Sequence, residues 1–122
     1  MARASIEVQQ GKELANKFKQ ISKSVENEIE QALFESALMI ERDAKIKVPV
    51  DTGRLRASIS SRLVEKSGTP YAEVGTSISY AKIQEFGSSK QPAQPFLYPA
   101  YVENKQKILK KLAKAFKKGA GL

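Results

Sequence analysis

The longest stretch of the sequence without glycine or proline is residues 12–48, KELANKFKQISKSVENEIEQALFESALMIERDAKIKV. Its apolar residues recur at intervals of three or four, which is the spacing of one stripe on an amphipathic helix. They are Leu14, Phe18, Ile21, Val25, Ile29, Leu33, Ala37, Ile40, Ala44 and Val48. The pattern predicts a long helix over residues 11–48, either continuous or broken into two near SKSVENE (residues 22–28). Pro49 ends it, because the residue before a proline disfavours helical angles.

A hairpin and a short helix are predicted to follow. The segments LRASISSRLVEK and YAEVGTSI have the character of strands, and the turn sequence SGTP between them favours a hairpin over residues 55–78. The next segment, SYAKIQEFG, predicts a short helix over residues 79–87. We expect Ser79 to cap its start and Gly87 to take the left-handed conformation that stops it.

The chain is predicted to close with a loop and a second long helix. Residues 88–97 contain two prolines and form the loop, and residues 98–118 form the helix. Pro99 suits the first turn of this helix, and Gly119 is expected to stop it. A long helix, a hairpin, a short helix and a long helix in this order predict a single α+β domain spanning residues 1–122.

The composition excludes several classes of chemistry. The chain of 122 residues has no cysteine and no histidine, which removes disulfides, thiolate catalysis, Ser-His catalysis and the usual zinc sites. It also lacks phosphate-binding glycine loops, dinucleotide-binding loops and metal-ligand clusters, so no cofactor and no metal are expected. No apolar run approaches the roughly 20 residues that span a membrane, and the first ten residues do not resemble a signal peptide. These features predict a protein of a cytoplasm-like compartment that is not an enzyme.

The positive charge is concentrated at the C-terminal end. The net charge is +8, and residues 105–122 hold seven lysines and no acidic residue. Five of the lysines are predicted to share a helix face away from the apolar stripe: Lys107, Lys110, Lys111, Lys114 and Lys118. This face is either a solvated surface or a contact with DNA or with an acidic partner. Because no base-reading motif accompanies it, any DNA contact is expected to be independent of sequence.

The tripeptide Asp51-Thr52-Gly53 matches the short signature of aspartic proteases. In a chain of this length, such an enzyme would have to be a dimer whose two aspartates share a proton. Arg54 and Arg56 oppose this reading, since they would hold both carboxylates ionised. The favoured interpretation is a turn or helix N-cap in which Asp51 accepts backbone N–H groups and Gly53 allows a tight turn. The turn motif then comprises Pro49, Asp51, Thr52, Gly53 and Leu55, with Leu55 and Ile59 packing inward.

Three sequence blocks, in this order, resemble a family of tailed-bacteriophage morphogenesis proteins. The blocks are AKIKVPVDTGRLRASI (residues 44–59), YAKIQEFG (residues 80–87) and QPFLYPA (residues 94–100). The resemblance covers about residues 5–118 and departs at Gln94, where arginine is expected in many members. It implies a tail-component or neck protein that acts in head–tail joining or tail completion. It also implies a ring, expected to be a hexamer, stacked between the head-closure or connector ring and the tail tube or tail terminator.

The candidate interface residues are Arg54, Arg56, Tyr80, Glu85, Phe86, Gly87, Pro95 and Phe96. Aromatic residues among them could anchor a contact between subunits. The alternative is that they serve the core, and this alternative is favoured for Ile83 and Phe86, and also for Phe96 with Leu97. Glu85 needs a partner if it is buried, and Arg54 and Arg56 are the expected candidates, either within the fold or across subunits.

The sequence therefore favours a structural virion protein, a neck or tail-completion subunit assembled in the host bacterial cytoplasm. The hairpin and residues 80–87 are expected to make the ring contact, and the proline loop and the basic helix to contact other rings. The first alternative is a small basic protein that binds nucleic acid through the C-terminal helix. The second is the dimeric aspartic protease.

Overall fold

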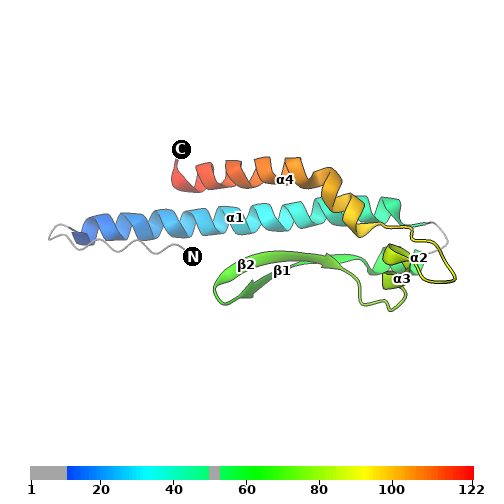
Figure 1. Cartoon of the computed structure of the whole chain (residues 1–122). Helices are drawn as coiled ribbons and strands as arrows, with labels where there is room; N and C mark the ends of the chain where they lie inside the picture. Colours follow the sequence, from blue (N-terminus) through cyan, green and yellow to red (C-terminus); the bar gives the residue numbers. More distant parts are fainter. Residues whose placement is uncertain (1–10, 50–52) are drawn as a thin grey trace.

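The computed structural model describes residues 11–49 and 53–122. It contains two long helices, two one-turn helices and a two-stranded antiparallel hairpin, which confirms the predicted α+β class. In chain order the elements are α1 (Gly11–Lys47), α2 (Gly53–Ser58), β1 (Ser60–Lys66), β2 (Thr69–Gly75), α3 (Ala81–Phe86) and α4 (Leu97–Ala120). The helix α1 forms the long axis, and α4 and the hairpin pack along different sides of it (Figure 1).

The helix α1 is a single continuous helix, so the sequence alternative of a broken pair is wrong. Its apolar stripe is buried most deeply near its C-terminal end, where Ala37, Ala44 and Val48 are at most 2% exposed. Ile21, nearer the N-terminus, is 43% exposed. The core therefore lies at one end of the molecule. It is built from Ala44, Val48, Leu55, Ile59, Phe96 and Ala100.

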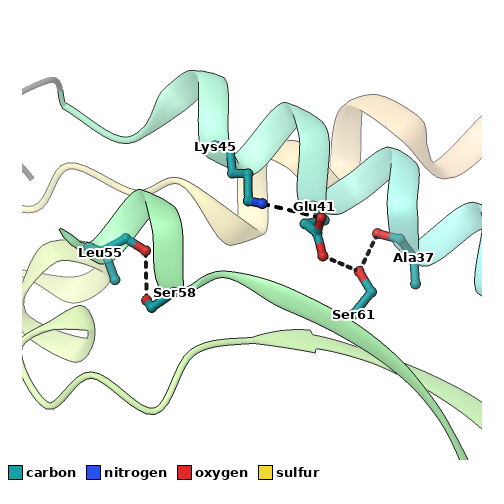
Figure 2. Close-up of polar contacts among 6 residues, drawn as sticks. All are labelled: Ala37, Glu41, Lys45, Leu55, Ser58 and Ser61. Atoms are coloured by element: carbon teal, nitrogen blue, oxygen red, sulfur yellow. Dashed lines mark hydrogen bonds and ion pairs between the residues drawn. The ribbon is translucent and has the colours of Figure 1, made fainter. Parts of the chain in front are cut away.

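The hairpin begins later than predicted, because residues 53–58 form the helix α2. Leu55 and Ile59 are four residues apart and 0% and 2% exposed, so one helical turn points both into the core. The Ser58 hydroxyl donates a hydrogen bond of 2.7 Å to the Leu55 carbonyl oxygen within this turn (Figure 2). The strands then pair from Ser60 opposite Gly75 to the tip.

The hairpin tip has the backbone of a tight two-residue turn. Ser67 and Gly68 both have positive φ, 53° and 78°, as a turn matched to the twist of the strands requires. The Ser61 hydroxyl at the other end ties β1 to α1. Its oxygen lies 3.1 Å from the Ala37 carbonyl oxygen and 3.0 Å from a Glu41 carboxylate oxygen (Figure 2).

Two predicted helix ends are wrong. Tyr80, not Ser79, precedes α3, and no side chain caps that end. Gly119 does not stop α4, which continues to Ala120 and ends at Gly121 in the left-handed conformation. Gly119 instead allows α4 to cross α1 closely, because a Cβ atom there would lie 2.5 Å from the Val25 Cα atom.

Gly87 does end α3 with positive φ, as predicted, although its ψ of 178° is extended rather than left-handed helical. Its N–H group donates a 2.7 Å hydrogen bond to the Ile83 carbonyl oxygen. A Cβ atom at this position would lie 2.7 Å from the Ala93 backbone nitrogen. Glycine is therefore required there both for its conformation and for space.

Candidate interaction surface

An open apolar channel runs between α4 and β2, with α1 as its floor. Its volume is about 840 Å³. The floor is provided by Leu33, Ala37 and Ile40, and the walls by Tyr71 and Val74 of β2, Phe86 of α3, and Tyr98, Tyr101 and Ile108 of α4. The channel exists because α4 and the hairpin each pack on α1 and scarcely touch one another.

Large apolar side chains stand exposed beside this channel. Phe86 is 75% exposed, Tyr98 68%, Tyr101 44% and Ile83 42%. The expectation that Ile83 and Phe86 pack the short helix into the core is therefore wrong for the single chain. Three of these residues, Phe86, Tyr98 and Tyr101, line the channel itself, and large apolar side chains exposed around one groove are typical of a site that another molecule covers.

Glu85 holds the start of α4 in place. Its carboxylate is buried, with the residue 9% exposed, and it accepts three backbone N–H groups: Phe96 at 3.0 Å, Leu97 at 2.9 Å and Tyr98 at 3.1 Å. The first N–H groups of a helix have no partner within the helix and carry a partial positive charge, so a carboxylate satisfies them well. Within the chain, Glu85 therefore binds backbone N–H groups rather than Arg54 or Arg56. A pairing across subunits stays a prediction.

Gln84 strengthens this connection between α3 and the start of α4, which we call the polar joint. Its amide nitrogen donates to the Gln94 side-chain oxygen at 3.0 Å, and the Gln94 N–H group donates to the Gln84 carbonyl oxygen at 2.9 Å. Gln94 thus binds a neutral partner. Together with Glu85, these contacts fix α3, and the channel residue Phe86 on it, relative to α4.

The other candidate interface residues fall into different environments. Phe96 is 0% exposed and lies in the core, so the core alternative is confirmed for its side chain. Tyr80 packs against the core cluster from outside, whereas Pro95 and Arg54 are exposed. Arg56 is half-buried and donates from Nη2 to the Val48 carbonyl oxygen at 2.9 Å, at the end of α1.

The turn motif is described only in part. Leu55 is buried as predicted, Pro49 is half-buried, and Gly53 begins α2. Asp51 and Thr52 lie outside the described residues, so the N-cap role of Asp51 stays a prediction.

The five lysines do not share one outward face. Lys111 forms a 2.7 Å ion pair with Glu35 and Lys118 a 3.7 Å ion pair with Glu28, so both point toward α1. The contact with Lys111, helped by a hydrogen bond from Gln31, lowers the pKa of Glu35. The remaining three lysines, Lys107, Lys110 and Lys114, are exposed.

The sequence analysis missed Asn104, a polar residue within the buried stripe of α4. Asn104 is 2% exposed, and its amide nitrogen donates to Asp43 Oδ2 at 2.6 Å and to the Ala100 carbonyl oxygen at 2.7 Å. This hydrogen bond, followed by the contact with Arg42, lowers the pKa of Asp43. The sequence could have predicted this role for Asn104, because a polar side chain on the buried stripe of a helix needs a partner across the helix interface.

The described residues offer no group of three carboxylates that could hold a metal ion. Nor does any described helix have the length and hydropathy needed to cross a membrane. What they do offer is the open channel, with a polar joint between α3 and α4 at one end.

A family model described as "Bacteriophage HK97-gp10, putative tail-component" matches residues 12–87, which is more than half of the chain. The chain belongs to this family. No curated protein and no solved structure gives a significant match. The match spans α1, α2, the hairpin and α3, and it confirms the resemblance to phage tail components over these residues. The α4 wall of the channel lies beyond it.

Proposed function

We propose that this tail component is a neck or tail-completion subunit that forms a closed ring joining tail to head. The observation that carries the proposal is the open apolar channel, whose walls expose Phe86 and Tyr98 in the single chain. A subunit of a closed ring needs two different patches that fit each other, because the contact runs head to tail around the ring. The channel supplies one of these patches.

The hairpin and residues 80–87 make the ring contact in this proposal. They form the wall of the channel through Tyr71, Val74 and Phe86. The proline loop, with the exposed Pro95, and the basic side of α4 are left to contact the rings above and below. These rings are the head-closure or connector ring and the tail tube or tail terminator, and the protein's own ring is a hexamer located in the virion neck.

The proposed role requires no catalysis. Membership of a tail-component family supports a structural role, and the protein would work by shape and complementary surfaces. The protease alternative would instead require acid-optimum cleavage that is abolished by Asp51→Asn, so an assay of that kind separates the two.

The proposed function is tested by measuring mass in solution by light scattering, alone and with purified tail tubes or connector-bearing heads. We expect a ring, either free or appearing only on the tubes or heads. Phe86→Ala should prevent the ring and leave the folded monomer intact. Leu109 is an exposed apolar residue of α4 that does not line the channel, so Leu109→Ala should leave both the ring and the folded monomer intact. A monomer that ignores both tubes and heads would refute the proposal.

The exposed lysines support a second candidate, contact with DNA. Lys107, Lys110 and Lys114 lie on one side of α4 without an ion pair within the described residues, and DNA that passes through a ring would meet such a surface. The contact should weaken steeply with salt. Replacing all three by glutamine should abolish it, whereas replacing the paired Lys111 and Lys118 should change it less.

A further inference from the structure

The N-terminal part of α1 extends beyond the rest of the described molecule. The closest approach of α4 to α1 at this end is Gly119 against Val25, and α4 ends one residue later. Figure 1 shows α1 continuing past the end of α4 and past the tip of the hairpin. We call this part, residues 11–24, the overhang. At 1.5 Å per residue it is roughly 20 Å long.

The overhang meets α4 only at its last residue, Ser24, whose carbonyl oxygen would lie 3.0 Å from a Cβ atom at Gly119, as far as the described residues show. All of its side chains that the structure describes are exposed, including Ile21. A helix of this length is marginal in water unless an apolar face packs against something. The sequence continues the apolar stripe of α1 through it, with Leu14, Phe18 and Ile21 at intervals of four and three. The overhang is therefore a helix whose sequence carries an apolar stripe, and the described residues do not cover the one stripe side chain that the structure describes, Ile21.

The charge of the overhang complements one end of the channel. The overhang holds four lysines and one glutamate in its sequence. Glu26 and Glu30 of α1 lie seven residues before the channel-floor residues Leu33 and Ala37, so they continue the same side of the helix. Within the described residues, neither glutamate forms an ion pair. A basic helix entering the channel at this end would meet them.

The dimensions also agree. The α4 wall is lined from Tyr98 to Ile108, which corresponds to about 15 Å of helix. The α4 wall is therefore nearly three helical turns long. The apolar residues of the overhang, Leu14 to Ile21, cover about two turns. The overhang can therefore place its whole apolar stripe against the channel and leave its lysines outside.

We propose that the overhang of one copy lies in the apolar channel of the next copy. This inference rests on the proposed ring and identifies the second of its two patches. The overhang and the channel are different surfaces of the subunit, so their contact is heterologous and can close into a ring. The apolar stripe covers Phe86 and Tyr101, and the lysines approach Glu26 and Glu30 of the neighbouring copy.

Cross-linking tests the contact cleanly, because the chain has no cysteine of its own. Ile21→Cys and Tyr101→Cys are prepared as separate proteins, one of them labelled with ¹⁵N. The two are mixed under the conditions in which the unmodified chain forms rings and are treated with a short bis-maleimide reagent. We expect a covalent dimer that contains one labelled and one unlabelled chain. Arg42→Cys, exposed on the side of α1 away from the channel, replaces Tyr101→Cys in the control and should give no such dimer.

The outcomes separate this inference from the proposed function. Rings in which Ile21→Cys of one chain is cross-linked to Tyr101→Cys of another support both the ring and the contact between the overhang and the channel. Rings without it, or with cross-links only between two copies of Ile21→Cys, overturn the inference and leave the ring standing. A double variant of one chain that cross-links only within itself shows that the channel is covered from the same subunit and also overturns it. The absence of any assembly refutes both.

Charge reversal gives a second readout that needs no cysteine. Lys17→Glu with Lys19→Glu should abolish ring formation, and adding Glu26→Lys with Glu30→Lys to the same chain should restore it. All four positions are exposed or half-buried, so the monomer should remain folded. Assembly that is unaffected by the first pair, or not restored by the second, would count against the contact.

Discussion

The joint between α3 and α4 makes a sharp prediction at Glu85. Its carboxylate accepts the N–H groups of Phe96 and Leu97 on one oxygen and that of Tyr98 on the other. A hydrogen bond to a charged group contributes about 1.5–3 kcal/mol, and a buried donor left without a partner costs about 1–3 kcal/mol. Because the Tyr98 end is open to water, we expect Glu85→Ala to lower the free energy of unfolding by about 3–5 kcal/mol rather than by the full sum.

Glu85→Gln separates the charge from the hydrogen bonds. The amide keeps one oxygen, which can still accept from Phe96 and Leu97, but its NH₂ group then faces the Tyr98 N–H group. Two of the three hydrogen bonds therefore remain, at the strength of neutral ones, and the attraction of the carboxylate to the helix start is lost. We expect a loss of about 1.5–3 kcal/mol, intermediate between the wild type and Glu85→Ala.

Urea unfolding followed by circular dichroism measures both variants. Glu73→Gln is the matched control, since Glu73 forms an exposed 2.6 Å ion pair with Arg62, which is expected to contribute about 0–1 kcal/mol. Hydrogen exchange at residues 96–98 should accelerate in both Glu85 variants and not in the control. If Glu85→Gln and Glu73→Gln were equally stable, the carboxylate would not be holding α4 in the way we describe.

Three further predictions concern the packing and the pH dependence. Gly119→Ala should destabilise the protein by about 1–3 kcal/mol in urea unfolding, although alanine is the better helix former, because the helices must separate to admit a Cβ atom. Phe96→Ala should cost about 3–5 kcal/mol in the same assay, since the side chain is 0% exposed. The hydrogen bond from Asn104 lowers the pKa of Asp43 in the folded state, so its contribution to stability is present above the unfolded pKa of about 3.9 and is lost as the pH falls through the folded pKa. Asp43→Asn should therefore flatten the acid side of the stability–pH curve measured by urea unfolding.

The features that could be predicted from the sequence depend on residues that are close to one another in the chain. The spacing of apolar residues in α1 and α4 and the turn chemistry at Gly68 depend on residues a few positions apart. The features that could not be predicted depend on distant partners. A glycine near a helix end looks like a stop, and only the crossing of α1 shows that Gly119 makes room for Val25. The sequence showed that Glu85 would need a partner if it is buried. Because backbone N–H groups occur at nearly every residue, the sequence did not show that they, rather than an arginine, would be that partner.

The candidate site shows a deeper limit of the hydrophobic pattern. Ile83 and Phe86 were expected in the core because apolar residues on a short helix usually pack within their own chain. In the structure they are 42% and 75% exposed, and Phe86 lines the channel. The pattern of apolar residues does not say whether a given residue is covered by its own chain, covered by another molecule or left exposed. If the protein forms the proposed ring, part of its apolar pattern describes the interface between subunits, and the structure of the single chain shows which part that is.

The shape of the apolar channel depends on the polar contacts between α3 and the start of α4 more than on the apolar side chains that line it. Glu85 and Gln84 fix the angle between α3 and α4, and that angle sets the position of Phe86 relative to Tyr98 across the channel. Apolar packing alone is tolerant of small shifts, whereas three hydrogen bonds to one carboxylate are not. A variant weakened at Glu85 should accordingly lose assembly before it loses its fold. In the proposed ring, the width of the channel, and hence its fit to the helix of the neighbouring copy, would depend on the contacts of Glu85 and Gln84, which do not touch that copy.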